Sequence, residues 1–215
     1  MDPHDTNKLI LLSLAALFVM SCNTSTLDSP VFHPRHAAED VIAMYDSDSN
    51  GVLDANEMGA SAIIQPVLQR ADIDRNGEVT HTELMNRFAT YVADELSMTT
   101  FPCRLMLDGK PLAQAKVSLM PESFMGQGYE VATGTTSQSG HTVLSTPSIA
   151  TSGFSGVYFG VYRLEVSKKN TRGEELVPEH YNSTSQIGQE IAPDLKDLER
   201  GIIFNLTKKL SRKVP

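Results

Sequence analysis

Two twelve-residue segments constrain this chain more than any other feature. They are DSDSNGVLDANE at 46–57 and DIDRNGEVTHTE at 72–83. Each has an oxygen-bearing side chain at positions 1, 3, 5, 9 and 12 and a glycine at position 6. Gly51 and Gly77 allow the positive φ that a tightly curled loop needs. Because Ca²⁺ takes about six to eight oxygen ligands, this concentration of oxygens predicts two loops that each wrap around a hard cation.

The spacing D-x-[DN]-x-[DN]-G-x5-E is that of the EF-hand calcium loop, and both segments resemble this family over their full length. The resemblance implies one Ca²⁺ per loop, two in all, with Leu53 and Val79 paired as a short antiparallel bridge. The ligands it implies in the first loop are Asp46, Asp48, Asn50, the Val52 carbonyl, Asp54 through water, and both oxygens of Glu57. Those in the second loop are Asp72, Asp74, Asn76, the Glu78 carbonyl, Thr80 and bidentate Glu83.

Apolar residues flank both loops with helical spacing. The residues 1, 4, 5 and 8 places ahead of each loop are Tyr45, Ile42, Val41 and Ala38, and Ala71, Leu68, Val67 and Ile64. This period predicts an amphipathic helix entering each loop, the second starting at Pro66. After the second loop the predicted stripe consists of Leu84, Phe88, Tyr91 and Val92. An acidic loop that is merely solvated would not need these flanks, so they favour metal binding.

The N-terminal region indicates export. An apolar run of twelve residues, 9–20, follows Lys8 and is interrupted only by Ser13. It is too short to span a bilayer and is typical of a signal peptide. Residues 19–22, VMSC, resemble a bacterial lipobox with Cys22 as the lipidated first residue of the mature chain. We therefore expect a signal peptide at 1–21, a flexible tether at 22–36, and anchorage to a cell-envelope membrane. Ordinary secretion, with an incidental Cys22 thiol, is the alternative.

The number of cysteines and the distribution of charge limit which modifications and binding partners the chain can have. The chain has two cysteines, so a lipidated Cys22 leaves Cys103 without a partner, and we expect it to be a small buried side chain in or beside a strand. Residues 37–100 carry twelve acidic residues against three arginines, a net charge of −9. Residues 101–215 carry thirteen basic against eleven acidic residues, a net charge of +2. Neither half has the basic stripe of a nucleic-acid-binding protein, so no nucleic-acid partner is expected.

Residues 101–215 consist of short apolar runs separated by turn residues. The predicted strands are 101–107, 115–120, 129–136, 141–145, 157–167, 184–191 and 201–206. About seven strands in this length predict a β-sandwich with one core. Taken with the loops, the expected fold is α+β in two domains, 37–100 and 101–215.

A family resemblance supports the sandwich. The segments 107–122, 135–145, 162–168 and 177–182 are similar in order and spacing to carboxypeptidase-regulatory-like domains. The resemblance implies a seven-stranded transthyretin-type β-sandwich with an accessory role and no peptidase activity. Two departures are the non-acidic turn at 137–139 and a longer Ser- and Gly-rich loop at 146–156.

The sequence contains no catalytic motif that we could identify. H-E-x-x-H, Walker A and G-x-G-x-x-G do not occur. The segment that begins at Gly153 resembles a nucleophile elbow, but Val157 stands where the pattern requires its second glycine. We expect a non-catalytic, calcium-binding, membrane-anchored lipoprotein whose sandwich contacts an unidentified surface protein or glycan. A calcium-responsive switch and an accessory subunit of a surface enzyme complex are the alternatives. Exported proteins meet steadier and higher calcium than cytosolic sensors do, which favours a structural role.

Overall fold

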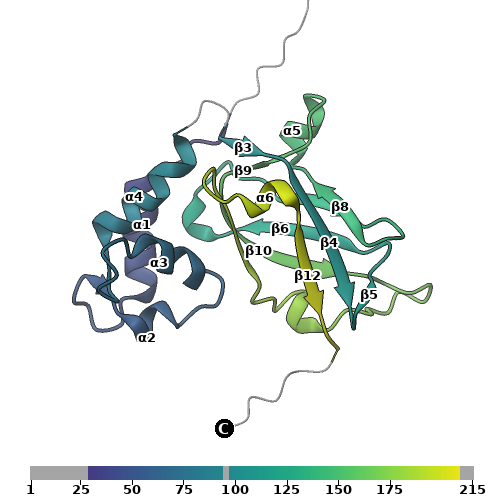
Figure 1. The fold of residues 1–215 in the computed structure, drawn as a ribbon, viewed down its shortest axis with the longest axis horizontal. Helices are drawn as coiled ribbons and strands as arrows, with labels where there is room; N and C mark the ends of the chain where they lie inside the picture. The colour runs from purple at the N-terminus through teal and green to yellow at the C-terminus, as the bar shows by residue number, and fades with distance from the viewer. Residues whose placement is uncertain (1–28, 94–96, 209–215) are drawn as a thin grey trace, which may run out of the picture.

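The computed structural model describes residues 29–93 and 97–208 and shows an α+β protein in which the helices between residues 34 and 89 lie beside two sheets (Figure 1). The predicted signal peptide, Cys22 and the rest of the predicted tether up to residue 28 lie outside the described residues. The helical part contains α1 Pro34–Tyr45, α2 Ala55–Met58, α3 Gln65–Ala71, α4 His81–Ala89 and the 3₁₀ turn η1 Thr90–Val92. Prolines occupy the first turns of α1 and α3, where a missing N–H costs nothing.

The predicted flanking helices form, and their apolar residues face inward. Val41, Val67 and Leu68 are fully buried, and Leu84, Phe88 and Tyr91 continue this buried face after the second loop. Val92 is an exception, because its side chain is 42% exposed. The α-helix ends at Ala89 and the chain tightens to a 3₁₀ turn. Such a turn has about three residues per revolution, so it rotates this side chain out of the stripe.

Eight strands build two sheets. One sheet has the order β12-β4-β5, with β8 also paired to β4, and the other has the order β11-β10-β6-β7. The first contains β4 Phe101–Leu107, β5 Lys110–Pro111, β8 His141–Leu144 and β12 Ile202–Leu206. The second contains β6 Lys116–Pro121, β7 Ala132–Thr135, β10 Gly160–Ser167 and β11 Gly188–Ile191. The pair β12–β4 is parallel and the other pairs are antiparallel.

The sequence placed most strands correctly, but it did not predict β5, which makes eight strands in the two sheets where seven were expected, and two further segments differ. The predicted strand 157–167 is interrupted at Phe159, whose N–H donates to the Ser97 carbonyl (2.8 Å). Its first part, β9 Val157–Tyr158, pairs with β3 Met98–Thr99. The segment 146–156, expected to be a loop, contains the short helix α5 Pro147–Thr151. The remaining short elements are η2 Ser123–Met125, η3 Glu179–Tyr181 and α6 Asp197–Arg200.

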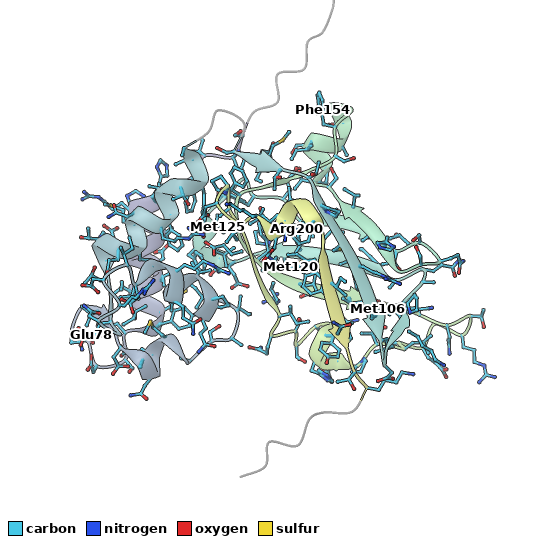
Figure 2. All side chains as sticks on the ribbon, in the orientation of Figure 1. Glu78, Met106, Met120, Met125, Phe154 and Arg200 are labelled. Carbon is cyan, nitrogen blue, oxygen red and sulfur yellow. The ribbon has the colours of Figure 1, made fainter. Side chains whose placement is uncertain are left out.

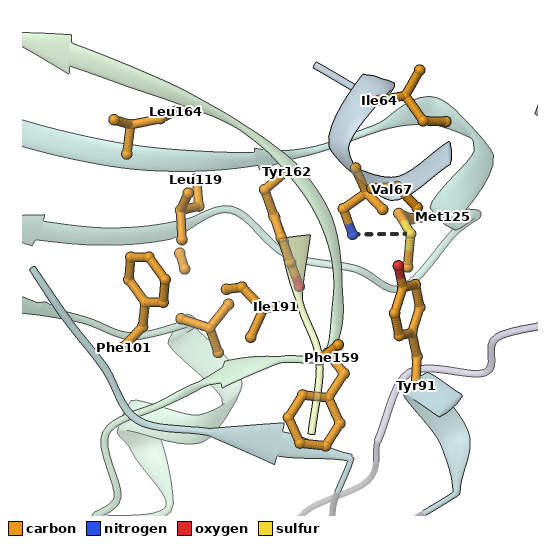
Figure 3. Packing of buried hydrophobic residues seen from close by; sticks show 14 of the residues in the cluster. Ile64, Val67, Tyr91, Phe101, Leu119, Met125, Phe159, Tyr162, Leu164 and Ile191 are labelled. Carbon is orange, nitrogen blue, oxygen red and sulfur yellow. Dashed lines mark hydrogen bonds between the residues drawn. The ribbon is translucent and has the colours of Figure 1, made fainter. Parts of the chain in front are cut away.

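The helical part and the sheets share one buried apolar cluster. Figure 3 shows Ile64, Val67 and Tyr91 of the helical part close to Met125, with Leu119, Tyr162 and Leu164 of the sheets beyond it. The Met125 sulfur accepts the Val161 N–H (3.4 Å). Apolar packing therefore runs from the helices into the sheets.

Aromatic rings and one glycine make this contact close. Phe88 of α4 stacks on Phe124 of η2, with ring centroids 5.7 Å apart, and meets Phe32 edge-on at 6.0 Å. Phe32 is buried and α1 begins at Pro34, so the last residues of the predicted tether belong to the folded part. On the sheet side, a Cβ at Gly188 would overlap the backbone of Ile63. Only glycine lets β11 approach the α2–α3 connection this closely.

Candidate metal centre

The first loop curls because its own side chains accept backbone N–H groups. Asp46 Oδ1 accepts from Asn50 (3.2 Å) and Oδ2 from Gly51 (2.9 Å). Asp48 Oδ1 also accepts the Asn50 N–H (3.1 Å), and Asn50 Oδ1 accepts from Val52 (2.9 Å). Gly51 has the predicted positive φ of 88°. These bonds leave several carboxylate lone pairs available, because each ionised carboxylate has about four acceptor sites.

The second loop repeats this arrangement. Asp72 accepts the N–H groups of Asn76 (3.1 Å) and Gly77 (3.2 Å). Asp74 accepts from Asn76 (3.1 Å), and Asn76 Oδ1 accepts from Glu78 (2.7 Å). Gly77 has a φ of 84°. The repeat follows from the shared residue spacing, since each acceptor lies two to five residues before its donor.

A two-residue ladder joins the loops at their centres. β1 Val52–Leu53 pairs antiparallel with β2 Val79–Thr80, with Leu53 opposite Val79 as predicted. Both of these side chains are fully buried. Figure 2 places Glu78, just before β2, on the side of the helical part that faces away from the sheets. The loops therefore lie at the outer end of the helical part and are fixed to one another.

Positions 9 and 12 of each loop also start the helix that follows. Asp54 with Glu57, and Thr80 with Glu83, form capping boxes at the N-termini of α2 and α4. Glu57 is buried, and its Oε1 reaches back to accept from the Ser47 N–H (2.6 Å) and hydroxyl (2.8 Å). The hydrogen bonds from the Asp54 backbone and from Ser47 lower the pKa of Glu57. This carboxylate is therefore ionised and held inside the loop.

The acidic side chains of each loop converge. Carboxylate oxygens of Asp46, Asp48 and Glu57 lie within 4.8 Å of one another, and those of Asp72, Asp74 and Glu83 do the same. Ligands about 2.3–2.6 Å from a shared Ca²⁺ ion would lie at most about 5 Å apart, so both clusters fit an ion at their centre. The donor set is made of oxygen, as a hard cation prefers. Two acidic clusters that can hold a metal ion are thus present.

The other predicted ligands lie in the same two loops. Asn50 and Asn76 each direct their amide nitrogen to the neighbouring aspartate, Asp48 (3.1 Å) and Asp74 (3.2 Å), while their Oδ1 atoms accept loop N–H groups. Asp54 Oδ1 accepts the N–H of Glu57 (3.0 Å) as the helix cap.

Sequence reasoning missed the positive φ of Ser49 (61°) and Arg75 (59°) at position 4. Nothing in these side chains signals that conformation, which the closing of the loop imposes.

An ionic network around a buried carboxylate, which the sequence did not reveal, joins the helices that flank the second loop to the sheets. Glu190 of β11 is 4% exposed, and its Oε2 accepts from Arg70 Nη1 (2.7 Å). Its Oε1 accepts from Arg87 Nε (2.7 Å) and from the Tyr91 hydroxyl (2.6 Å). Arg87 also donates to both carboxylate oxygens of Asp194, at 2.7 and 3.1 Å. The helices on either side of the second loop, α3 and α4, are therefore bonded to one carboxylate.

Burial and hydrogen bonding shift the pKa values of three members of this network, Tyr91, Arg87 and Asp194. Burial, reinforced by the Glu190 carboxylate, raises the pKa of Tyr91 well above its ordinary value, so its phenol stays protonated and donates. Burial lowers the pKa of Arg87, but its hydrogen bonds to Asp194 and Glu190 more than offset this and raise the pKa. The same hydrogen bond from Arg87 lowers the pKa of Asp194. These pKa shifts favour a protonated Tyr91, a charged Arg87 and an ionised Asp194.

Comparison with known proteins does not assign the chain to a family. No family model matches it, and no curated protein matches it. Among solved structures, the crystal structure of a 9R-lipoxygenase from Cyanothece PCC8801 matches over 52% of this chain and 16% of that one. The identity is 13% and the TM-score is 0.26, which is too low to support an argument. Within the described ranges, no helix combines the length and the apolar character needed to cross a bilayer.

Proposed function

We propose that the two loops bind one Ca²⁺ each and that residues 37–100 are an EF-hand pair packed on a transthyretin-type β-sandwich of residues 101–215. The observation that carries this proposal is the convergence of three carboxylates in each of two loops with the same spacing. Bound Ca²⁺ would offset the negative charge of the three carboxylates that converge in each loop. The protein in this proposal is non-catalytic, and its loops serve stability.

The ligand set favours Ca²⁺ over Mg²⁺. Each loop offers side-chain oxygens at five positions and a carbonyl at position 7, with a glutamate at position 12 that can bind through both oxygens. Such a large, flexible oxygen set suits Ca²⁺, which takes about six to eight ligands. Mg²⁺ demands near-octahedral geometry and usually keeps several waters, so a loop that supplies nearly every ligand itself suits it less.

Packing favours a structural role over a switch. A calcium sensor opens its helix pair and exposes an apolar groove to a partner. Here Val67, Phe88 and Tyr91, which would line such a groove, are fully buried in the cluster shared with the sheets. Opening α3 away from α4 would also separate Arg70 or Arg87 from Glu190. Removing one partner of a buried ion pair costs about 3–5 kcal/mol, so an opening that left Glu190 buried without its arginines would be costly, and the proposed structural role avoids it.

Calorimetric titration of the protein with Ca²⁺ tests the assignment. We expect two sites per chain, falling to one strong site in Glu57→Gln and in Glu83→Gln. Glu78→Gln is the matched control, because this residue contributes its carbonyl and its side chain is exposed. No heat of Ca²⁺ binding in the unaltered protein, or tighter binding of Mg²⁺, would refute the proposal.

We also propose that Cys22 carries a lipid that anchors the exported protein to a cell-envelope membrane. The support is the apolar run 9–20, whose last two residues begin the VMSC segment at 19–22. One acyl chain binds a membrane only marginally, so stable anchorage requires more than one. The native protein should be released from membranes by detergent and not by salt, and Cys22→Ser should abolish anchorage. An unmodified Cys22 in the native protein would mean simple secretion.

The partner of the sandwich would be a surface protein or glycan.

A further inference from the structure

We propose that Glu190 is a positioning residue for the second metal loop, although it belongs to a strand of the sheet. It lies 120 residues from Arg70 and 103 from Arg87 in the sequence. The inference rests on the proposed function, because it concerns the affinity of that same loop for Ca²⁺. One buried carboxylate holds the two helices that carry the loop.

The two arginines connect Glu190 to the two ends of the loop. Arg70 is in the last turn of α3, two residues before Asp72, the first loop position. Arg87 lies in α4 four residues after Glu83, the last loop position. Residues four apart in a helix lie on the same face. Since both arginines bind one carboxylate, the separation of the first and last ligands of this loop is fixed from outside the loop.

The loop needs such support when no cation is bound. Oxygens of Asp72, Asp74 and Glu83 lie within 4.8 Å of one another, and like charges at this distance repel. A loop free to spread would have to be drawn together again on binding, which lowers its affinity. Glu190 resists spreading through two charged hydrogen bonds of 2.7 Å and the Tyr91 hydroxyl at 2.6 Å. The clamp thus keeps the ligands close to the arrangement that binding requires.

The first loop is organised differently. Its closing residue Glu57 is held inside the loop by Ser47 and by the Asp54 N–H (3.0 Å). Within residues 29–93 and 97–208, no ion pair joins α1 or α2 to the sheets. Local hydrogen bonds therefore support both loops, and the second loop is supported in addition by a distant carboxylate. Loss of Glu190 should weaken only the second loop. By linkage, metal in the second loop should in turn strengthen the contact with β11.

Calorimetry of the full chain tests this asymmetry. Each loop is measured alone, the second in a Glu57→Gln background and the first in a Glu83→Gln background. Glu190→Gln should weaken Ca²⁺ binding by the second loop about tenfold, at the lower end of what supporting residues contribute to metal sites. The first loop should change by less than about twofold, because Glu190 bonds to neither that loop nor the helices that flank it. Asp194→Asn is the control, because it removes a partner of Arg87 and leaves the Glu190 clamp intact.

A second readout works without metal. In chelator, amide hydrogens of residues 72–83 should exchange faster in Glu190→Gln than in the unaltered chain, with 46–57 unchanged. Because Glu190→Gln removes one of the two charged partners of the buried Arg87 and can unfold the chain, Arg70→Met provides an independent test. The Arg70 side chain is 41% exposed, so its loss should spare the fold and still weaken the second loop about threefold. Equal weakening of both loops, or no change in the second, would overturn the inference. Absence of Ca²⁺ binding in the unaltered chain would instead refute the proposed function.

Discussion

Truncation of Phe88 should destabilise the helices and the sheets together. Its ring is fully buried, stacks on Phe124 at 5.7 Å and contacts Phe32 at 6.0 Å and Tyr91 at 5.6 Å. Replacing a buried phenylalanine with alanine costs about 3–5 kcal/mol, through lost burial and the cavity left behind. We take about 4 kcal/mol for Phe88→Ala, a large share of a typical stability of about 5–15 kcal/mol.

Urea denaturation in saturating Ca²⁺ measures this loss with two probes. Circular dichroism at the helix band follows the helices. Alkylation of Cys103 follows the sheets, because this thiol in β4 is 2% exposed and burial raises its pKa to about 12. The thiolate is the reactive form, so labelling at neutral pH requires unfolding of the sheets. With a slope of about 2.5 kcal/mol/M, both midpoints should fall by about 1.6 M.

A matched phenylalanine provides the control. Phe154 is 65% exposed and lies at the tip of the segment after α5 (Figure 2). Phe154→Ala should change the free energy of unfolding by less than about 0.5 kcal/mol, as surface substitutions usually do. If Phe88→Ala lowers the helical midpoint and leaves that of Cys103 protection unchanged, the helices and sheets have separate cores and the reasoning is wrong.

Three further predictions concern metal, pH and close packing. Urea denaturation should give a free energy of unfolding about 2.7 kcal/mol per site higher at a Ca²⁺ concentration of 100 times the Kd than in chelator, because Ca²⁺ binds the folded form. An unchanged free energy of unfolding would show that Ca²⁺ does not bind the folded form preferentially. The lowered pKa of Asp194 means that its ion pair stabilises the fold above the ordinary value of 3.8 and loses this effect as the pH falls through the folded-state pKa. The small stability difference between the unaltered chain and Asp194→Asn should therefore vanish on acidification from pH 6, and a difference that persists at the acid end would contradict this. Gly188→Ala should reduce the melting temperature and increase amide exchange in 59–64, because its Cβ overlaps the Ile63 backbone; unchanged exchange would show that β11 does not approach this segment.

The sequence by itself determined the two loops and most of the strands. Each loop hydrogen bond joins residues at most five apart, apart from those made by the closing glutamate, so spacing alone was enough to place the acidic side chains together. The pairing of Leu53 with Val79 followed from the same repeat. Strand positions followed from runs of apolar residues between turn residues, and the boundaries in the structure differ from the predicted ones by a few residues.

Only the tertiary structure decided how these parts meet. The burial of Phe32, the exposure of Val92 and the single apolar cluster depend on which surfaces face one another, and no local pattern encodes this. The Glu190 network is the strongest case, because nothing near Glu190 in the sequence distinguishes it from a solvated glutamate. Its pairing with Arg70 and Arg87 exists because β11 packs against α3 and α4. Contacts between residues more than 100 positions apart are set by the packing of whole elements, whereas the chemistry of a twelve-residue loop is set by its own spacing.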